Sequence, residues 1–171
     1  MYIRILTSAD AEIYRELRLQ SLLQNPEAFL SSYESESKIS MVTTRIRLEP
    51  SDNNFTLGAF IAEEKLVGIV TLFRESRPKI RHKAHVYSVY VDPCARKQGV
   101  GRLLMLELIK RAKLVPGLEI LILTLTSTNL SAKRLYESLG FIRYGTEPRA
   151  MKLGPDYQDE DLMYLPLVPE L

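Results

Sequence analysis

The sequence contains very little cysteine, since Cys94 is the only one among 171 residues. One cysteine cannot form an intramolecular disulfide, and it excludes metal sites built from CxxC pairs. We therefore predict no bound metal. The lack of disulfides suits a reducing compartment, so we expect a cytoplasmic protein.

The chain also lacks long hydrophobic runs. Its first residues, MYIRILTSADAEIYREL, have no long apolar core after a basic start, so we predict no secretory signal there. No apolar run reaches the roughly 20 residues that a membrane-spanning helix needs. We therefore expect no membrane partner.

Neither sign of charge dominates. The 23 Lys and Arg residues against 21 Asp and Glu residues give a net charge of +2. A nucleic-acid-binding protein would need basic residues clustered on one face. Basic residues cluster locally at 79–83 and 96–102, but the second cluster falls in a loop with a different predicted ligand, described below. We expect no nucleic-acid partner.

The remaining composition is that of an ordinary globular protein, with 46% hydrophobic and 26% charged residues. The sequence shows no repeat, low-complexity tract or linker, and its length suits one domain with a sizeable core. We therefore predict a single domain over residues 1–171.

Apolar periodicity, caps and turn residues predict the order βααβββαβαββ, which is a mixed α/β fold. Predicted strands cover residues 2–6, 56–63, 66–74, 84–92, 118–125, 141–146 and 161–167. Predicted helices cover residues 11–23, 33–48, 99–114 and 129–139, with a turn or short helix at 27–32 and a loop at 147–160.

The most informative segment is residues 85–113, HVYSVYVDPCARKQGVGRLLMLELIKRAK. It predicts a strand, a tight turn containing Gly99 and Gly101, and a long helix. Backbone N–H groups at such a helix N-terminus, together with the helix dipole, stabilise a phosphate or pyrophosphate. The segment therefore predicts a phosphate-bearing ligand.

Two common phosphate-binding motifs do not fit this turn. A P-loop requires GxxxxGK[ST], which the sequence lacks. A dinucleotide-binding turn requires GxGxxG, and here the third glycine position is Leu104. Both interpretations are weak.

A third motif fits better. The pattern Arg96-x-x-Gly99-x-Gly101 resembles the [Q/R]xxGx[G/A] signature of the GNAT superfamily of acetyl-CoA-dependent N-acyltransferases. The strand before it, residues 87–93, resembles the family's signature strand, and residues 129–141 resemble its second cofactor element. Segments 23–29 and 145–152 also resemble peripheral features of bacterial members. The resemblance covers almost the whole chain and implies a mostly antiparallel central sheet flanked by helices.

The resemblance implies an acetyl-CoA site. Amides of residues 98–102 would wrap the pyrophosphate, Gly99 and Gly101 would allow close approach, and nearby cations would add charge. The signature strand would splay from its neighbour, so that its backbone pairs with pantetheine and one N–H polarises the thioester carbonyl. The implied cofactor-binding residues are Val89, Tyr90, Val91, Arg96, Lys97, Gln98, Gly99, Val100, Gly101, Arg102 and Asn129. The alternatives are core packing for the two valines and a helix cap for Asn129.

Catalytic roles also follow from the resemblance. Tyr136 matches the family's usual general acid, which would protonate the leaving thiolate; alternatively it is one aromatic residue of a half-buried helix. The glutamate that some members carry on the signature strand is absent. His85 is either a base or a structural residue at a strand end. Cationic neighbours would lower the pKa of Cys94, although we expect that residue only to fill the loop.

Acceptor residues are less well defined. The predicted acceptor-site residues are Glu27, Phe29, Tyr87 and Glu147. The resemblance places Glu27, Glu147 and the acidic run 159–161 in segments that line the acceptor site, where they would attract a cationic amine. The alternative for the run 159–161, a solvated acidic turn, is the more typical one. We predict transfer of acetyl to a primary amine by direct attack in a ternary complex; the alternative is a non-catalytic acyl-CoA-binding sensor or regulatory module. The acceptor is a small-molecule amine or a peptide or protein amine, and exposed strand edges offer a way to form a homodimer.

Overall fold

The computed structural model describes residues 1–168, except for the side chain of Glu63, so the predicted domain boundary at residue 171 lies outside the described residues. The strands are β1 (Tyr2–Ile5), β2 (Asn54–Phe60), β3 (Leu66–Arg74), β4 (Lys83–Val91), β5 (Ile120–Thr126), β6 (Ile142–Leu153) and β7 (Asp156–Pro166). The helices are α1 (Ala11–Gln24), α2 (Tyr33–Ser37), α3 (Met41–Leu48), α4 (Val100–Ala112) and α5 (Leu130–Ser138). No helix in this part of the chain is long and apolar enough to cross a membrane.

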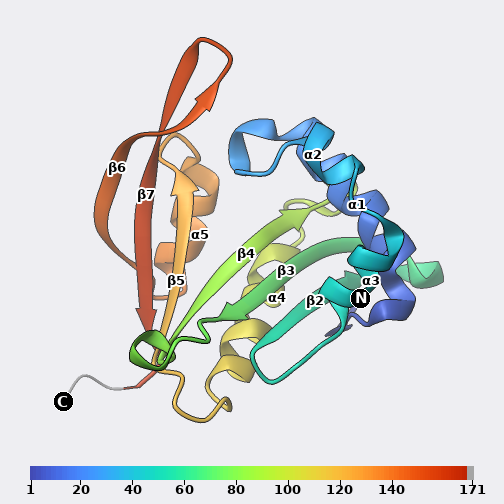
Figure 1. Cartoon of the computed structure of the whole chain (residues 1–171), viewed down its shortest axis with the longest axis horizontal. Helices are drawn as coiled ribbons and strands as arrows, with labels where there is room; N and C mark the ends of the chain where they lie inside the picture. The colour runs from blue at the N-terminus through green and yellow to red at the C-terminus, as the bar shows by residue number, and fades with distance from the viewer. Residues whose placement is uncertain (169–171) are drawn as a thin grey trace.

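All seven strands form one sheet in the order β1-β2-β3-β4-β5-β7-β6. Every neighbouring pair is antiparallel except β4 and β5, which are parallel. The predicted mixed α/β fold with a mostly antiparallel sheet flanked by helices is therefore confirmed. The parallel pair lies in the middle of the sheet, and Figure 1 shows β4 and β5 diverging from there.

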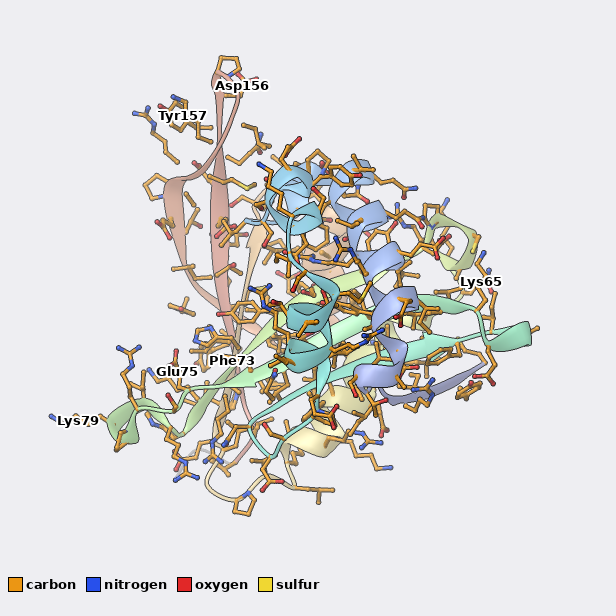
Figure 2. All side chains as sticks on the ribbon, turned by 45° about the vertical axis from the view of Figure 1, so that its right-hand side comes forward. Lys65, Phe73, Glu75, Lys79, Asp156 and Tyr157 are labelled. Atoms are coloured by element: carbon orange, nitrogen blue, oxygen red, sulfur yellow. The ribbon has the colours of Figure 1, made fainter. Side chains whose placement is uncertain are left out.

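Two elements differ from the sequence prediction. The helix predicted over 33–48 is two helices, because the Ser40 side chain accepts a hydrogen bond from the Thr43 amide at 3.1 Å and so caps a new helix. The loop predicted over 147–160 is wrong: these residues complete the β6–β7 hairpin, which turns at Gly154 with φ +58°. Figure 2 shows Asp156 and Tyr157 at the hairpin tip, beyond the rest of the sheet.

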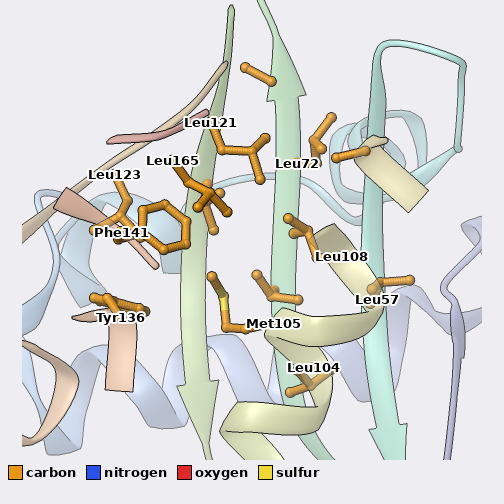
Figure 3. Packing of buried hydrophobic residues seen from close by; sticks show 14 of the residues in the cluster. Leu57, Leu72, Leu104, Met105, Leu108, Leu121, Leu123, Tyr136, Phe141 and Leu165 are labelled. Carbon is orange, nitrogen blue, oxygen red and sulfur yellow. The ribbon is translucent and has the colours of Figure 1, made fainter. Parts of the chain in front are cut away.

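Helices cover both faces of the sheet. On one face α1 and α3 bury a cluster that includes Leu17, Leu48 and Ile69. On the other face α4 buries Leu104, Met105 and Leu108 against β2 and β3 (Figure 3). Apolar residues on both faces of the central strands explain why these strands read as nearly continuous hydrophobic runs.

Gly68 allows α4 to approach β3 closely. A Cβ added at this position would lie 2.9 Å from Leu104 Cδ1 and 3.3 Å from the Tyr90 carbonyl oxygen. Both distances are too short for ordinary van der Waals contact. The glycine thus fixes the position of α4, whose first residues follow the signature turn.

Candidate active site

The central feature of the site is the gap between β4 and β5. The two strands pair only from Lys83 to His85, opposite Ile120 to Ile122. Beyond His85 the β5 side of β4 has no strand partner among the described residues. A cleft of about 1320 Å³ opens there. The family resemblance predicted this splaying, and the structure confirms it.

A bulge in β4 lies within the cleft. Ile69 of β3 faces Tyr90, and Thr71 faces Tyr87, so that Val70 stands opposite two residues, Ser88 and Val89. Ser88 adopts φ +54°, which turns the strand. A bulge changes the direction of the backbone N–H and C=O groups, and this bulge lies where β4 no longer pairs with β5.

Most residues predicted for the site line this one cleft. Its lining includes Glu27, Phe29, Tyr87, Val89, Tyr90, Val91, Arg96, Lys97, Gly99, Val100, Gly101, Arg102, Asn129 and Tyr136. Two predicted residues, Gln98 and Glu147, are not part of the lining. Gln98 instead turns back and donates to the Cys94 carbonyl at 3.1 Å, and Glu147 is exposed on β6.

The turn before α4 has the backbone geometry of an anion site. Lys97 and Gly99 have φ values of +60° and +79°. The first amide bonded within the helix belongs to Leu103, which donates to the Gly99 carbonyl at 3.0 Å. The amides of residues 100–102 therefore have no acceptor within the helix. A Cβ at Gly99 would meet nothing within 4 Å, so its positive φ is what favours glycine there.

Gly101 has a different status. A Cβ there would lie 3.5 Å from Leu135 Cδ2 and 3.6 Å from Val91 Cγ2, which is ordinary contact. Its φ is not positive, so the described residues alone do not require glycine. Close approach of the ligand to the protein backbone at Gly101 remains the predicted reason for a glycine there.

The arginines of the turn already have protein partners. Arg96 donates through Nε to the Val91 carbonyl at 2.9 Å and through Nη2 to Asn25 Oδ1 at 3.0 Å. Arg102 donates to Ser138 Oγ at 2.8 Å. These contacts tie the turn to β4, α1 and α5, so Arg96 has a bracing role whether or not it also touches a phosphate. Lys97 is exposed on the cleft.

Cys94 does not have the lowered pKa suggested by its cationic neighbours. A hydrogen bond with the Asp92 carboxylate raises the pKa of this exposed thiol, and Lys65, 3.7 Å away, only partly opposes that effect. The suggested lowering is therefore wrong. His85 also has a structural setting: its Nε2 lies 3.2 Å from Glu75 Oε1, its ring stacks on Tyr87, and it is not among the described residues that line the cleft.

Helix α5 contributes two predicted residues. Asn129 Oδ1 accepts the Ala132 amide at 3.1 Å, so Asn129 is a helix cap and also lines the cleft. Tyr136 is 6% exposed, and its ring lies 5.9 Å from that of Phe141. Burial alone raises the pKa of Tyr136 above its ordinary value, because the neutral hydroxyl is favoured away from water. Tyr136 is thus protonated at any physiological pH.

Residues after α1 form the side of the cleft where the acceptor is predicted to bind. The backbone carbonyl of Glu27 accepts a hydrogen bond from Thr126 Oγ1 at 2.5 Å, which holds this segment against β5. Phe29 packs 6.5 Å from Tyr90, ring to ring. These contacts span about 60 to 100 positions in the sequence, and sequence alone gave no means of detecting them.

Glu160 lines the cleft, although the predicted acceptor-site residues do not include it. The run 159–161 is more typical of a solvated acidic turn, but Glu160 lies on β7 and is 9% exposed. Burial raises the pKa of Glu160, and the nearby Glu147 raises it further, while a hydrogen bond from Thr124 opposes this. The neighbouring Asp161 is structural: burial opposes its ionisation, but hydrogen bonds from Lys133, Thr146 and Ser127 outweigh burial and lower its pKa to about 2.

Arg18 is the second missed residue. It lies on the buried face of α1, is 7% exposed, and lines the cleft. The signal in the sequence was the poor apolar stripe of this helix, because Arg18 and Ser21 occupy positions on its buried side. A charged residue on a buried helix face usually has a specific partner.

The architecture is that of known acetyltransferases. An acetyltransferase of the GNAT family from Streptococcus pneumoniae superposes with a TM-score of 0.84 at 26% identity, covering 96% of this chain and 98% of that one. A GNAT-superfamily phosphinothricin acetyltransferase from Sinorhizobium meliloti, solved in complex with acetyl-CoA, gives a TM-score of 0.82 at 20% identity, covering 96% and 87%. The fold is therefore that of the GNAT acetyltransferases.

Sequence comparison gives the same family. The model of the acetyltransferase (GNAT) family matches residues 17–141, which is most of the chain. The chain belongs to the GNAT acetyltransferase family. Mycothiol acetyltransferase from Thermomonospora curvata is 37% identical over 92 residues, covering 53% of this chain and 29% of that protein. Human N-acetyltransferase 8 is 33% identical over 85 residues, covering 49% and 37%. The matched region spans well under half the length of either curated relative.

Proposed function

We propose that this protein transfers an acetyl group from acetyl-CoA to a primary amine by direct attack in a ternary complex. The observation that carries the proposal is the cleft itself: the stretch of β4 beyond its pairing with β5, the first turn of α4 and the buried Tyr136 all line it. Acetyl-CoA, when bound, supplies a thioester whose carbonyl carbon accepts the amine. The residues present fit such a molecule.

The amides of residues 100–102 suit the pyrophosphate, because an anion at a helix N-terminus gains from both N–H groups and the dipole. Lys97 adds positive charge at the same turn. The stretch of β4 from Val89 to Val91 offers backbone groups to pantetheine amides, as an added strand would use them. The Val91 carbonyl already accepts from Arg96, so we assign that pairing chiefly to Val89.

Two side chains in the cleft suit proton transfer. We assign Glu160 as the base that takes a proton from the incoming ammonium, directly or through a water. Its pKa is raised toward neutral pH, which suits a general base. We assign Tyr136 as the acid that gives its proton to the departing sulfur. An ammonium loses two protons on becoming an amide. The first passes to Glu160 before attack. The second leaves the nitrogen after the C–N bond forms and replaces the proton that Tyr136 gives to the sulfur as the C–S bond breaks, so atoms and charge balance.

The rival function is a module that binds acyl-CoA without turnover. Calorimetry with acetyl-CoA, CoA and ATP tests the shared requirement first: the proposal expects saturable binding of acetyl-CoA and CoA, but not of ATP. Release of free CoA thiol on addition of an amine panel then separates enzyme from sensor. Absent binding by a folded sample would refute both functions. Binding without amine-dependent thiol release would favour the sensor.

Two further expectations stay predictions. A cytoplasmic location rests on the single cysteine alone. A homodimer rests on exposed strand edges, and β6, half of the projecting hairpin, is one edge of the sheet. Sedimentation of the purified chain would measure its oligomeric state.

A further inference from the structure

Arg18 carries a buried positive charge without a protein partner. Its Nη1 is shielded from solvent and has no hydrogen-bond partner in the described part of the chain. The ion pairs found among these residues do not include it. Leaving a guanidinium buried and unpaired is strongly unfavourable, so natural proteins rarely do so without a ligand to pair with it.

The surroundings of Arg18 hold its guanidinium in place within the cleft. Its Cζ lies 4.9 Å from the centre of the Phe29 ring, so the guanidinium packs over an aromatic ring that also lines the cleft. An aromatic ring on one side leaves the N–H groups at the edge of the guanidinium available. The guanidinium N–H groups of Arg18 are therefore held in place as hydrogen-bond donors.

The other charges facing this part of the cleft do not neutralise Arg18. Tyr14, which lines the cleft, lies within the electrostatic influence of Arg18, Arg47 and Glu36. Arg47 Nη1 lies 3.8 Å from Glu36 Oε1, so the charges of these two side chains form an ion pair with each other. Arg18 is in none of the ion pairs of the described residues, so a ligand group with one negative charge could pair with it.

The site is separate from the predicted phosphate turn. Helix α1 packs on one face of the sheet, whereas α4, which follows that turn, packs on the other (Figure 1). Arg18 thus lies on the side of α1 and Phe29, where the acceptor residues were predicted. Glu27 and Glu160 line the same cleft and suit an ammonium group.

We propose that Arg18 binds a carboxylate of the acceptor, so that the substrate is an amine that also carries a carboxylate, such as an amino acid, and not a polyamine. This inference rests on the proposed function. The planar guanidinium matches the two oxygens of a carboxylate in a bidentate pair. The single negative charge of the carboxylate would pair with the positive charge of Arg18.

The test uses pairs of amines that differ only in the carboxylate: each amino acid against its amide, and lysine against cadaverine. We expect kcat/KM to favour the carboxylate member by about 10- to 100-fold, mainly through KM, as for a hydrogen bond to a charged group. Arg18→Met, which replaces the guanidinium with an unbranched apolar side chain, should abolish this preference. Equal use of both members by the wild type, or a preference that survives in Arg18→Met, would overturn the proposal.

A binding measurement keeps the subsite separate from catalysis. N-acetyl-amino acids and their amides serve as probes in thermal-shift titrations of the wild type, of Arg18→Met and of Arg45→Met; Arg45 is an exposed arginine of α3 outside the cleft lining. The acids, but not the amides, should stabilise the wild type and Arg45→Met, and neither should stabilise Arg18→Met. If acetyl-CoA fails to bind, the proposed function fails, but this titration still decides the subsite. Identical shifts in all three proteins would refute it.

Discussion

Replacing Tyr136 with phenylalanine removes one oxygen from the buried end of the cleft. The tyrosine is 6% exposed, and burial is the only influence on the pKa of its hydroxyl, without a hydrogen bond or a charge. The hydroxyl therefore contributes little to the fold. We expect Tyr136→Phe to have a free energy of unfolding within about 1 kcal/mol of the wild type, since removing a buried polar group that lacks a strong partner is nearly neutral.

The effect on turnover should be much larger. A positioned general acid contributes on the order of 10²-fold or more, and 10²-fold corresponds to about 2.7 kcal/mol of transition-state stabilisation. Tyr136→Phe should lower kcat by roughly that factor and change the Kd of acetyl-CoA by less than about twofold. Because burial raises the pKa of Tyr136 above its ordinary value, the wild-type rate should show no loss at neutral or mildly alkaline pH from ionisation of this residue.

The assay combines thiol release for kcat, calorimetry for Kd and thermal melting for stability. Tyr144→Phe is the matched control, because Tyr144 is 57% exposed on β6 and is not part of the described cleft lining. An unchanged kcat in Tyr136→Phe would refute the acid role. A variant that loses Tm and cofactor affinity together with kcat would show that Tyr136 acts through packing with Phe141.

Three further variants test neighbouring residues. Gly99→Ala forces a side chain into φ +79° without a clash, so it should cost about 1 kcal/mol and lower Tm by roughly 2–4 °C; an unchanged Tm would contradict the strain argument. Glu160→Gln should lower kcat and remove the acidic limb of the pH profile, because the base works only when ionised; persistence of that limb would exclude it. Asp161 has a folded pKa of about 2 against an ordinary 3.8, so its contribution of roughly 2 kcal/mol is complete above pH 4 and disappears as the pH falls through 2. In denaturant titrations at neutral pH, Asp161→Asn should lack this contribution to the free energy of unfolding. Equal stability of the wild type and Asp161→Asn at pH 7 would refute the assignment.

Local signals were sufficient to predict the elements that form the proposed cofactor half of the cleft. Residues 85–113 form strand, turn and helix as predicted, because a left-handed Gly99, the apolar spacing of α4 and the strand before them act within a few residues of one another. The cap at Asn129 is equally local, since its side chain bonds an amide three residues later. Such features depend little on the rest of the chain, and sequence alone determined them.

Two errors arose where polar sequence hid regular structure. Residues 147–160 are rich in charge and mostly exposed in the projecting hairpin, so burial left no apolar alternation there. Residues 33–48 contain serines that act as caps, and these divide one expected helix into two. Pairing between β6 and β7 determines the first segment, and the serine caps determine the second.

Only the tertiary structure decided which residues line the predicted acceptor half of the cleft. Arg18 and Glu160 are 142 positions apart, yet both are buried and face one cavity. Arg96, predicted as a phosphate ligand, also bridges β4 and Asn25. The physical reason is that a charge acquires its role from what surrounds it: its solvation, its partners and the space left beside it arise from distant segments brought together by the fold.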